Sequence, residues 1–209
     1  IQNIDYCNRT IEQYDIITKV IGNLINKCGI YTSQIIESHV NSIFDKFKKE
    51  QSFKYEYTKY AMISVLKEFL KNSPVISYNK IIEAYESFND IILNYKDTKE
   101  YIRYATQSLI REFLLLLSNR DLEIREDFTK RIYKTCIYNV VKNNISDPNV
   151  THGVILVLQA CTVRREFFNE KYIVTMDFLN RNKTHKSQNV RIAIIDVIPY
   201  FAEYLKDVF

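Results

Sequence analysis

Residue types that could carry out chemistry are few in this chain of 209 residues, and they lie far apart in the sequence. The three histidines, His39, His152 and His185, have no Cys, Asp or Glu at the spacing that ligands of zinc or other transition metals require. We therefore predict no metal site. We expect His152 to pack within its helix beside Gly153.

The four cysteines, Cys7, Cys28, Cys136 and Cys161, are also scattered and lack Cys-x-x-Cys spacing. This spacing favours neither a zinc site nor a disulfide framework, and reduced thiols of a cytosolic protein are the preferred interpretation. No nucleophile with an acid and a base, and no phosphate-binding loop, can be assembled from the sequence. We therefore expect no catalysis and no bound cofactor in this segment.

A repeated pattern organises the chain instead. Residues 101–114 align without a gap to residues 57–70, and the two stretches share two tyrosines, an alanine and a Glu-Phe-Leu ending. Residues 149–162 and 189–202 keep the same register more loosely. The small residue of each copy falls at Ala61, Ala105, Gly153 and Ala193, so the intervals are 44, 48 and 40 residues, the period of solenoids built from helical pairs.

Composition sets the fold class. Three Gly and three Pro are too few for the turns of a β-rich fold, while an apolar content of 46% supplies a continuous core. The sequence predicts an all-α protein, an α-solenoid of HEAT-type helical pairs with about four pairs plus a leading helix. We treat residues 1–209 as one array with approximate units 1–30, 31–74, 75–120, 121–163 and 164–209.

Helical periodicity and local stop signals place the individual helices. We expect a leading helix over residues 11–27, stopped by Cys28 and Gly29, and first helices of pairs over residues 34–49, 77–95, 123–143 and 167–180. The repeated stretches form the second helices. Asp147 and Pro148 should open the second helix at residues 149–162, and Ser77 should cap the first helix over residues 77–95. Pro199 should kink the last second helix near residues 196–198.

Asp97 and Arg103, six residues apart, form the most suggestive charged pair. In HEAT-type repeats an Asp in the turn and an Arg at the start of the second helix commonly bond the turn to the helix and to neighbouring units. We interpret the pair as structural, and a catalytic role is the less favoured alternative. Arg191 is assigned to the same structural set in the last copy.

Charge and hydropathy exclude several function classes. Lys and Arg number 29 against 25 Asp and Glu, and this net charge of +4 is too small and too scattered to favour nucleic acid or an anionic membrane. The longest apolar runs, residues 113–117 and 154–158, are far shorter than the roughly 20 residues that cross a bilayer. The N-terminus has no signal-peptide pattern, and we expect the chain to be a piece of a longer one.

Several stretches resemble one particular kinase family. Residues 59–68, Lys-Tyr-Ala-Met-Ile-Ser-Val-Leu-Lys-Glu, resemble the Arg-Tyr-Ala-Ala-Val-Leu-Val-Leu-Arg-Glu run near the N-terminus of target-of-rapamycin (TOR) serine/threonine protein kinases. Residues 151–158 resemble the family's Ile-His-Gly-Ala-Leu-Leu-Ile-Leu, and further matches at residues 19–24, 169–172 and 197–199 follow in the same order. The resemblance therefore covers nearly the whole chain.

The chain also departs from that family pattern. A long variable insertion often follows the His-Gly helix in the family, whereas residues 161–167 join the two helices directly here. No Gly-rich loop, His-Arg-Asp or Asp-Phe-Gly signature of a protein kinase is present.

The resemblance implies a non-catalytic scaffold within a larger kinase whose kinase domain lies outside these residues. It implies protein partners, a raptor-type scaffold subunit and in some lineages a Rheb-type GTPase, together with a dimeric parent, a cytoplasmic location and recruitment to endomembranes through partners. No contact residues are carried over. The alternatives are a free-standing HEAT adaptor in transport or cargo binding and, least favoured, an enzyme.

Overall fold

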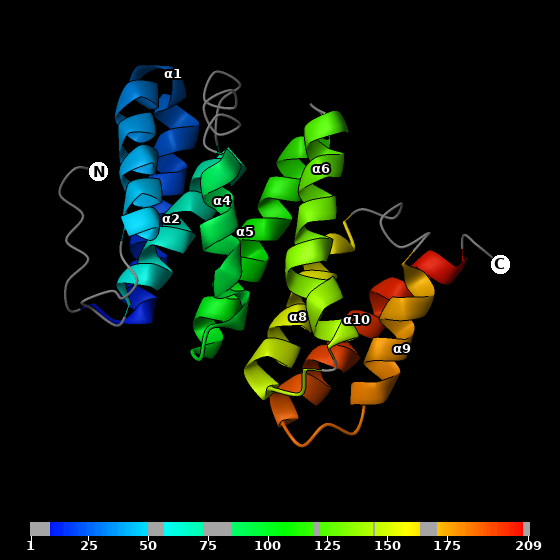
Figure 1. Ribbon diagram of the computed structural model, residues 1–209. Coiled ribbons are helices and arrows are strands. Elements are labelled where there is room, and N and C mark those ends of the chain that lie inside the picture. The colour runs from blue at the N-terminus through cyan, green and yellow to red at the C-terminus, as the bar shows by residue number, and fades with distance from the viewer. Residues whose placement is uncertain are drawn as a thin grey trace. The chain divides into compact units, whose positions relative to one another are not determined.

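The computed structural model describes residues 9–49, 57–72, 85–118, 122–143, 145–163 and 171–206. Within these ranges every regular element is helical, as Figure 1 shows. The chain divides into two compact units, Ile1–Ile92 and Leu93–Phe209, which are described separately.

The first unit is built from α1 (Ile11–Lys49), α2 (Thr58–Asn72) and α4 (Tyr85–Ile92). Helix α1 packs against both α2 and α4. The ring of Phe44 on α1 lies 5.3 Å from that of Phe88 on α4, and the hydroxyl of Tyr60 on α2 donates a hydrogen bond to Asp15 on α1. The core also contains fully buried Tyr14 and Phe69, so aromatic side chains fill the space between these helices.

Helix α1 differs from the sequence prediction. Every residue from Ile11 to Lys49 is helical, so the expected gap between two helices at Cys28 and Gly29 is wrong. The ribbon nevertheless turns back on itself between its dark-blue and lighter-blue parts in Figure 1. The chain thus changes direction there without an intervening stretch of non-helical residues.

The second unit begins with the 3₁₀ turn η1 (Leu93–Lys96) and α5 (Glu100–Ser118). A long helical run follows, consisting of α6 (Leu122–Ile132), the π-helical segment η2 (Tyr133–Tyr138) and α7 (Asn139–Lys142). The unit ends with α8 (Pro148–Cys161), α9 (Tyr172–Asn182) and α10 (Gln188–Lys206). The sequence predicted the helical run over residues 123–143 but not its π-helical part.

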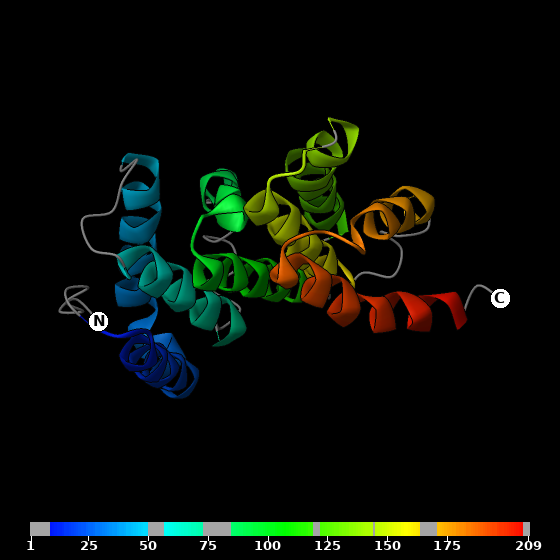
Figure 2. The same ribbon diagram turned by 90° about the horizontal axis from the view of Figure 1, so that it is seen from below.

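Helix α8 is the central element of the second unit. It packs against α5 and α10, and Figure 2 shows it between them. Ten of its residues are buried, including the unbroken stretch from Thr151 to Leu158. A helix that is apolar all round is stable only when neighbours cover every side, which is the environment seen here.

The start of α8 is fixed by its own sequence. The Asp147 side chain accepts hydrogen bonds from the backbone N–H groups of Asn149 and Val150, both at 2.9 Å. Pro148 occupies the first turn, where its missing N–H costs little. The predicted start at Asp147 and Pro148 is therefore confirmed.

Other predicted features have mixed outcomes. Pro199 lies inside α10 as expected, and the kink stays a prediction. The cap at Ser77 and the start of the helix predicted over residues 167–180 lie outside the described residues. No described helix is both long enough and apolar enough to cross a bilayer.

The predicted fold class is confirmed over the described residues. All of their regular structure is helical, and within each unit helices pack on their neighbours in the chain, as in an all-α solenoid. The HEAT type of the pairs and the five unit boundaries remain predictions.

Candidate functional site

Arg103 forms a buried polar junction between the turn before α5 and the start of α8. The residue is 3% exposed, and its guanidinium donates to the backbone carbonyls of Asp97 at 2.7 Å and Thr98 at 3.1 Å. It also donates to Oδ1 of Asn149 at 3.0 Å and to Nδ1 of His152 at 2.9 Å. One side chain on α5 thus bonds its own turn and a helix that lies 46 to 49 residues further along the chain.

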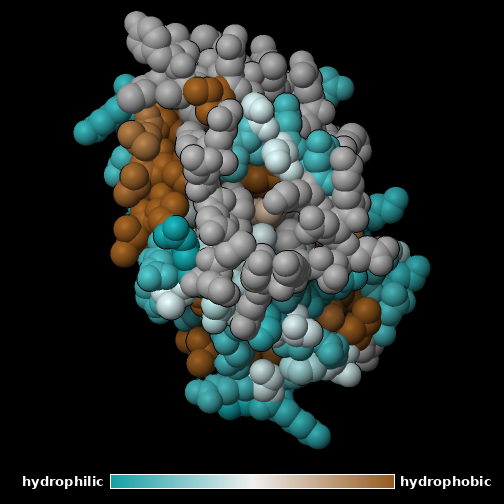
Figure 3. All heavy atoms as spheres, turned by 90° about the vertical axis from the view of Figure 1, so that its left-hand side faces the viewer, coloured by the Kyte–Doolittle hydropathy of each residue, from teal (hydrophilic) through white to brown (hydrophobic). Residues whose placement is uncertain are grey.

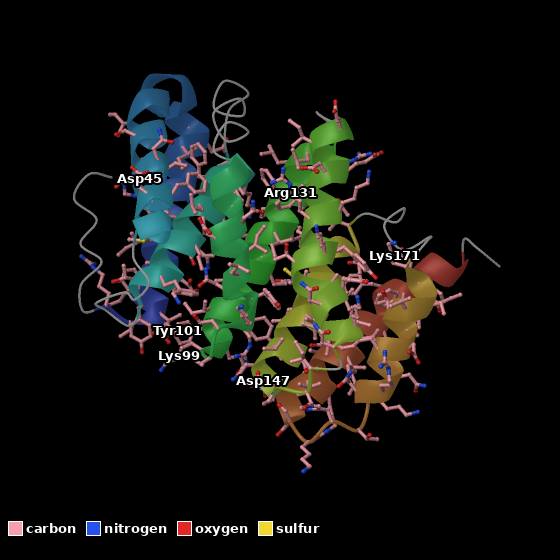
Figure 4. The ribbon with its side chains drawn as sticks, in the orientation of Figure 1. Asp45, Lys99, Tyr101, Arg131, Asp147 and Lys171 are labelled. Carbon is pink, nitrogen blue, oxygen red and sulfur yellow. The ribbon has the colours of Figure 1, made fainter. Side chains whose placement is uncertain are left out.

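The role of Asp97 is more local than the sequence suggested. Its carboxylate accepts a hydrogen bond from the N–H of Lys99, while the hydrogen bonds from Arg103 to this turn go to main-chain carbonyls. Burial lowers the pKa of Arg103, and the negative charges of Glu100 and, less strongly, Asp97 oppose this shift. Figure 4 places Lys99, in the turn before α5, and Tyr101, in the first turn of α5, at the same end of the unit as Asp147.

His152 is the partner that sequence reasoning missed. Its Nδ1 accepts a hydrogen bond from Nε of Arg103, so the one N–H proton of the neutral ring sits on Nε2. Burial and the positive charge of Arg103 lower the pKa of His152 to about 4. Its Nε2 is buried and has no hydrogen-bond partner among the described residues, and its ring meets that of Tyr104 edge-on at 5.5 Å.

Gly153 allows α8 to touch the main chain of η1. A Cβ atom built on Gly153 would lie 1.8 Å from the carbonyl oxygen of Tyr95. No side chain fits in that space, which accounts for glycine where the other copies have alanine. Burial also raises the pKa of the Tyr95 hydroxyl to about 12.

The arrangement at Arg103 recurs at the start of α10. The Arg191 guanidinium donates to the carbonyls of His185 at 2.7 Å and Lys186 at 2.9 Å, which are six and five residues earlier, as Asp97 and Thr98 are for Arg103. The equivalent residue before Gly153 is Thr151, and its hydroxyl donates to the carbonyl six residues earlier at 3.5 Å. In three copies of the repeat, the residue two positions before the small residue therefore forms hydrogen bonds from its helix to the preceding turn.

The remaining predicted positions lie on separate helices and do not come together as a site. Ala61, Ala105 and Ala193 are buried where helices pack, whereas Pro199 is exposed on α10. His39 lies on α1 and His185 in the turn before α10. Among the described residues no group of three potential ligands could hold a metal ion.

The two cysteines with described side chains, Cys136 and Cys161, are buried and not in a disulfide. Burial, with a smaller contribution from Cys161, raises the pKa of the Cys136 thiol. The thiolate is the reactive form, so Cys136 is not activated for nucleophilic chemistry. Cys7 and the side chain of Cys28 lie outside the described part.

Apolar side chains line two further surface features. On α1, Ile16, Val20 and Leu24 follow one another at intervals of four residues and are at least half exposed, and apolar residues form a brown patch in Figure 3. Between α9 and α10 lies a groove of about 370 Å³ whose lining includes Met176, Leu179, Ile194 and Ile198. Both features suit contact with other protein surfaces better than binding of a small polar substrate.

The chain is similar to one region of TOR kinases. It is 22% identical over 193 residues to the serine/threonine-protein kinase TOR of Arabidopsis thaliana, which covers 92% of this chain and 8% of that protein. It is 21% identical over 203 residues to TOR2 of Saccharomyces cerevisiae, an alignment that covers 93% of this chain and 8% of that protein. It is also 21% identical over 191 residues to tor1 of Schizosaccharomyces pombe, covering 91% of this chain and 8% of that protein. The resemblance predicted from sequence motifs is therefore confirmed.

The chain thus spans less than a tenth of the length of these curated relatives. An all-helical stretch of this extent fits a part of a larger kinase other than its kinase domain. No family model matches the chain. No solved structure matches it either.

Proposed function

We propose that this chain is a non-catalytic scaffold and partner-docking segment of a TOR-like serine/threonine kinase. The observation that carries the proposal is the similarity to TOR kinases along more than nine-tenths of the chain. The described elements add support because packed helices with exposed apolar side chains present an extended surface to other proteins without a pocket for chemistry. The kinase activity belongs to other parts of the parent chain.

The partners follow from the same proposal. A raptor-type scaffold subunit binds the assembled parent, a Rheb-type GTPase is a second partner in some lineages, and the parent is a dimer. This chain contributes HEAT-type helical pairs to the parent. The parent is located in the cytoplasm, and its partners recruit the assembly to endomembrane surfaces.

Purification of the endogenous full-length protein tests this proposal. We expect peptides from a kinase domain downstream of Phe209 and a co-purifying scaffold subunit. Deleting residues 1–209 from the full-length protein should remove the scaffold subunit but leave phosphorylation of a short free peptide intact. A gene product without a kinase domain would refute the proposal and favour the alternative, a free-standing HEAT adaptor in transport or cargo binding.

A further inference from the structure

The helices α5, α8 and α10 carry equivalent copies of the repeated stretch and form a row within the second unit. Helix α5 packs on α8, and α8 packs on α10, as Figure 2 shows. The small residues Ala105, Gly153 and Ala193 set their common register. The hydrogen bonds from Arg103 and Arg191 to carbonyls six and five residues earlier agree with that register. Each position of α10 therefore has a counterpart whose surroundings are known.

Ile198 on α10 is far more exposed than its counterparts. It is 47% exposed, whereas Ile110 on α5 and Leu158 on α8 are 1% and 0% exposed. Each of the three lies five residues after the small residue of its copy. One turn further along α10, Ala202 is exposed, while its counterpart on α5, Leu114, is fully buried. A face of the second helix that is covered in α5 is thus open in α10.

Helix α8 packs on the corresponding face of α5. Arg103 lies seven residues before Ile110 and therefore on the same side of α5. It donates hydrogen bonds to Asn149 and His152 of α8. Helix α8 also contacts η1, which itself contacts α5. The second helix of one pair thus lies against both elements of the preceding pair.

The last pair offers the same kind of groove, between α9 and α10, which lie side by side in Figure 1. The groove has a volume of about 370 Å³, and its lining is mainly apolar, with the side chains of Met176, Leu179, Ile194 and Ile198. No helix from the part of the chain that the structure describes fills it. The groove is therefore the counterpart of the site that α8 occupies on η1 and α5.

Lys183 is the counterpart of a residue that makes a close main-chain contact. It lines the groove and lies ten residues before the small residue of its copy, as Tyr95 does. The carbonyl oxygen of Tyr95 lies so close to Gly153 of α8 that a Cβ atom there would come within 1.8 Å. A helix packed in the same way on the last pair needs a glycine or another small residue opposite Lys183.

Arg191 has unused hydrogen-bonding capacity at the same face of α10. Within the described part of the chain its guanidinium donates only to two carbonyls of the preceding turn, and the residue is half-buried. Arg103 makes the equivalent two bonds and two more, to side chains three residues apart on α8, Asn149 and His152. A guanidinium has five N–H donors, so Arg191 can bond a further helix as Arg103 does.

We propose that the groove between α9 and α10 receives a helix of the parent chain encoded beyond residue 209. That helix packs on α10 as α8 packs on α5. Its first two turns present to Arg191 two side chains that accept hydrogen bonds and lie three residues apart. A small residue directly follows the second acceptor and faces the main chain of Lys183. Apolar side chains further along the helix cover Ile198.

A later segment of the same chain is the occupant that the observations favour. The units of a solenoid bury surface against their neighbours in the chain. The alignments to the curated TOR relatives cover only 8% of each relative, so most of a TOR-like parent lies outside these residues. A segment of the same chain also has a high effective concentration at the groove. This inference rests on the proposed function, in which the chain is part of a longer protein.

Cross-linking in the full-length protein tests the inference. A photoreactive diazirine analogue of leucine, close to isoleucine in size, is placed at position 198, and mass spectrometry identifies the peptide that it captures. We expect a peptide of the same chain from beyond residue 209, with two acceptor residues and a small residue at the stated spacing. Mixing isotope-labelled with unlabelled protein distinguishes capture within one chain from capture between two copies.

The same analogue at position 180, on the α9 side of the groove, should capture the same helix, because Asn180 also lines the groove. Position 24 on α1 is the control, since Leu24 is 50% exposed and lies outside the groove. The analogue there should not capture that helix. Capture of the same peptide from position 24 would overturn the inference.

Other outcomes separate this inference from the proposed function. Capture of another protein, of a second copy or of nothing at both groove positions would refute the inference, as would a captured helix without the acceptor and small residues. If the same preparation still contains the kinase domain and the scaffold subunit, the proposed function stands. A parent whose later helix fills the groove but which lacks a kinase domain would refute the proposed function alone.

Discussion

Substituting Gly153 by alanine should destabilise the protein, although alanine is the better helix former. The added Cβ would lie 1.8 Å from the Tyr95 carbonyl oxygen. To reach an ordinary contact of 3.4 Å, α8 and η1 would have to separate by about 1.6 Å. Because the opposing atom belongs to the main chain, no side-chain rotation can relieve the clash.

The magnitude follows from two opposing contributions. Overpacking against a backbone atom costs about 3 kcal/mol, the upper part of the range for such substitutions. The helix propensity of alanine returns about 1 kcal/mol. The net loss of about 2 kcal/mol should lower the melting temperature of a chain of this size by about 4–8 °C.

Gly22→Ala is the matched control, because Gly22 is also a buried helical glycine. A Cβ there would meet Oε2 of Glu68 at 2.6 Å and Nδ2 of Asn72 at 2.8 Å, and both atoms end flexible side chains that can move. We expect its stability to stay within about 1 kcal/mol of the wild type. Urea unfolding followed by circular dichroism measures both variants, and a Gly153→Ala protein as stable as the wild type would refute the argued close contact.

The remaining predictions concern the polar groups. Arg103→Ala should lower the free energy of unfolding in urea by about 3 kcal/mol, since it leaves several buried acceptors unpaired. Arg191→Ala, at a half-buried site, should lower it by about 1 kcal/mol. Equal losses of stability in the two variants would contradict the buried junction at Arg103. The pKa of His152 is lowered from 6.5 to about 4, so below pH 6.5 the unfolded chain binds a proton that the folded chain does not. The free energy of unfolding should therefore fall by up to about 3 kcal/mol as the pH drops from 6.5 to 4. The variant His152→Gln should lack this part of the pH dependence of stability. Tyr60→Phe should cost about 1–2 kcal/mol in the same assay because it removes the 2.5 Å hydrogen bond to Asp15, and a neutral result would show that this bond does not form.

Local features of this fold could be predicted from the sequence. Asp147 and Pro148 mark a helix start because both act on their own first turn. The small residues of the repeat mark buried positions because their spacing matches that of helical pairs. The first signal depends on neighbours within a few residues and the second on a repeat along the chain, so a single sequence contains both in full.

Contacts between distant segments could not be predicted in the same way. The sequence indicated a structural role for Arg103 but not its bond to His152, since the two lie 49 residues apart and meet only once α8 has packed on α5. The stop expected at Gly29 failed because helical residues continue on both sides of it.

The π-helical segment Tyr133–Tyr138 has a consequence for how its helical run meets the core. The buried residues Phe128, Ile132, Cys136 and Val140 follow one another at intervals of four. In a regular α-helix with 3.6 residues per turn, three such steps would rotate the last side chain by about 120° away from the first.

A π-helix has about 4.4 residues per turn, because its hydrogen bonds reach one residue further along the chain. Six residues in that geometry offset nearly all of the rotation, so all four side chains point the same way. The segment thus acts as a phase correction, through which a sequence with a four-residue period keeps one straight apolar edge against α5, η1 and α8. Deleting a single residue there would restore α-helical pitch and still leave Phe128 and Val140 on one face, because eleven α-helical steps make about three turns.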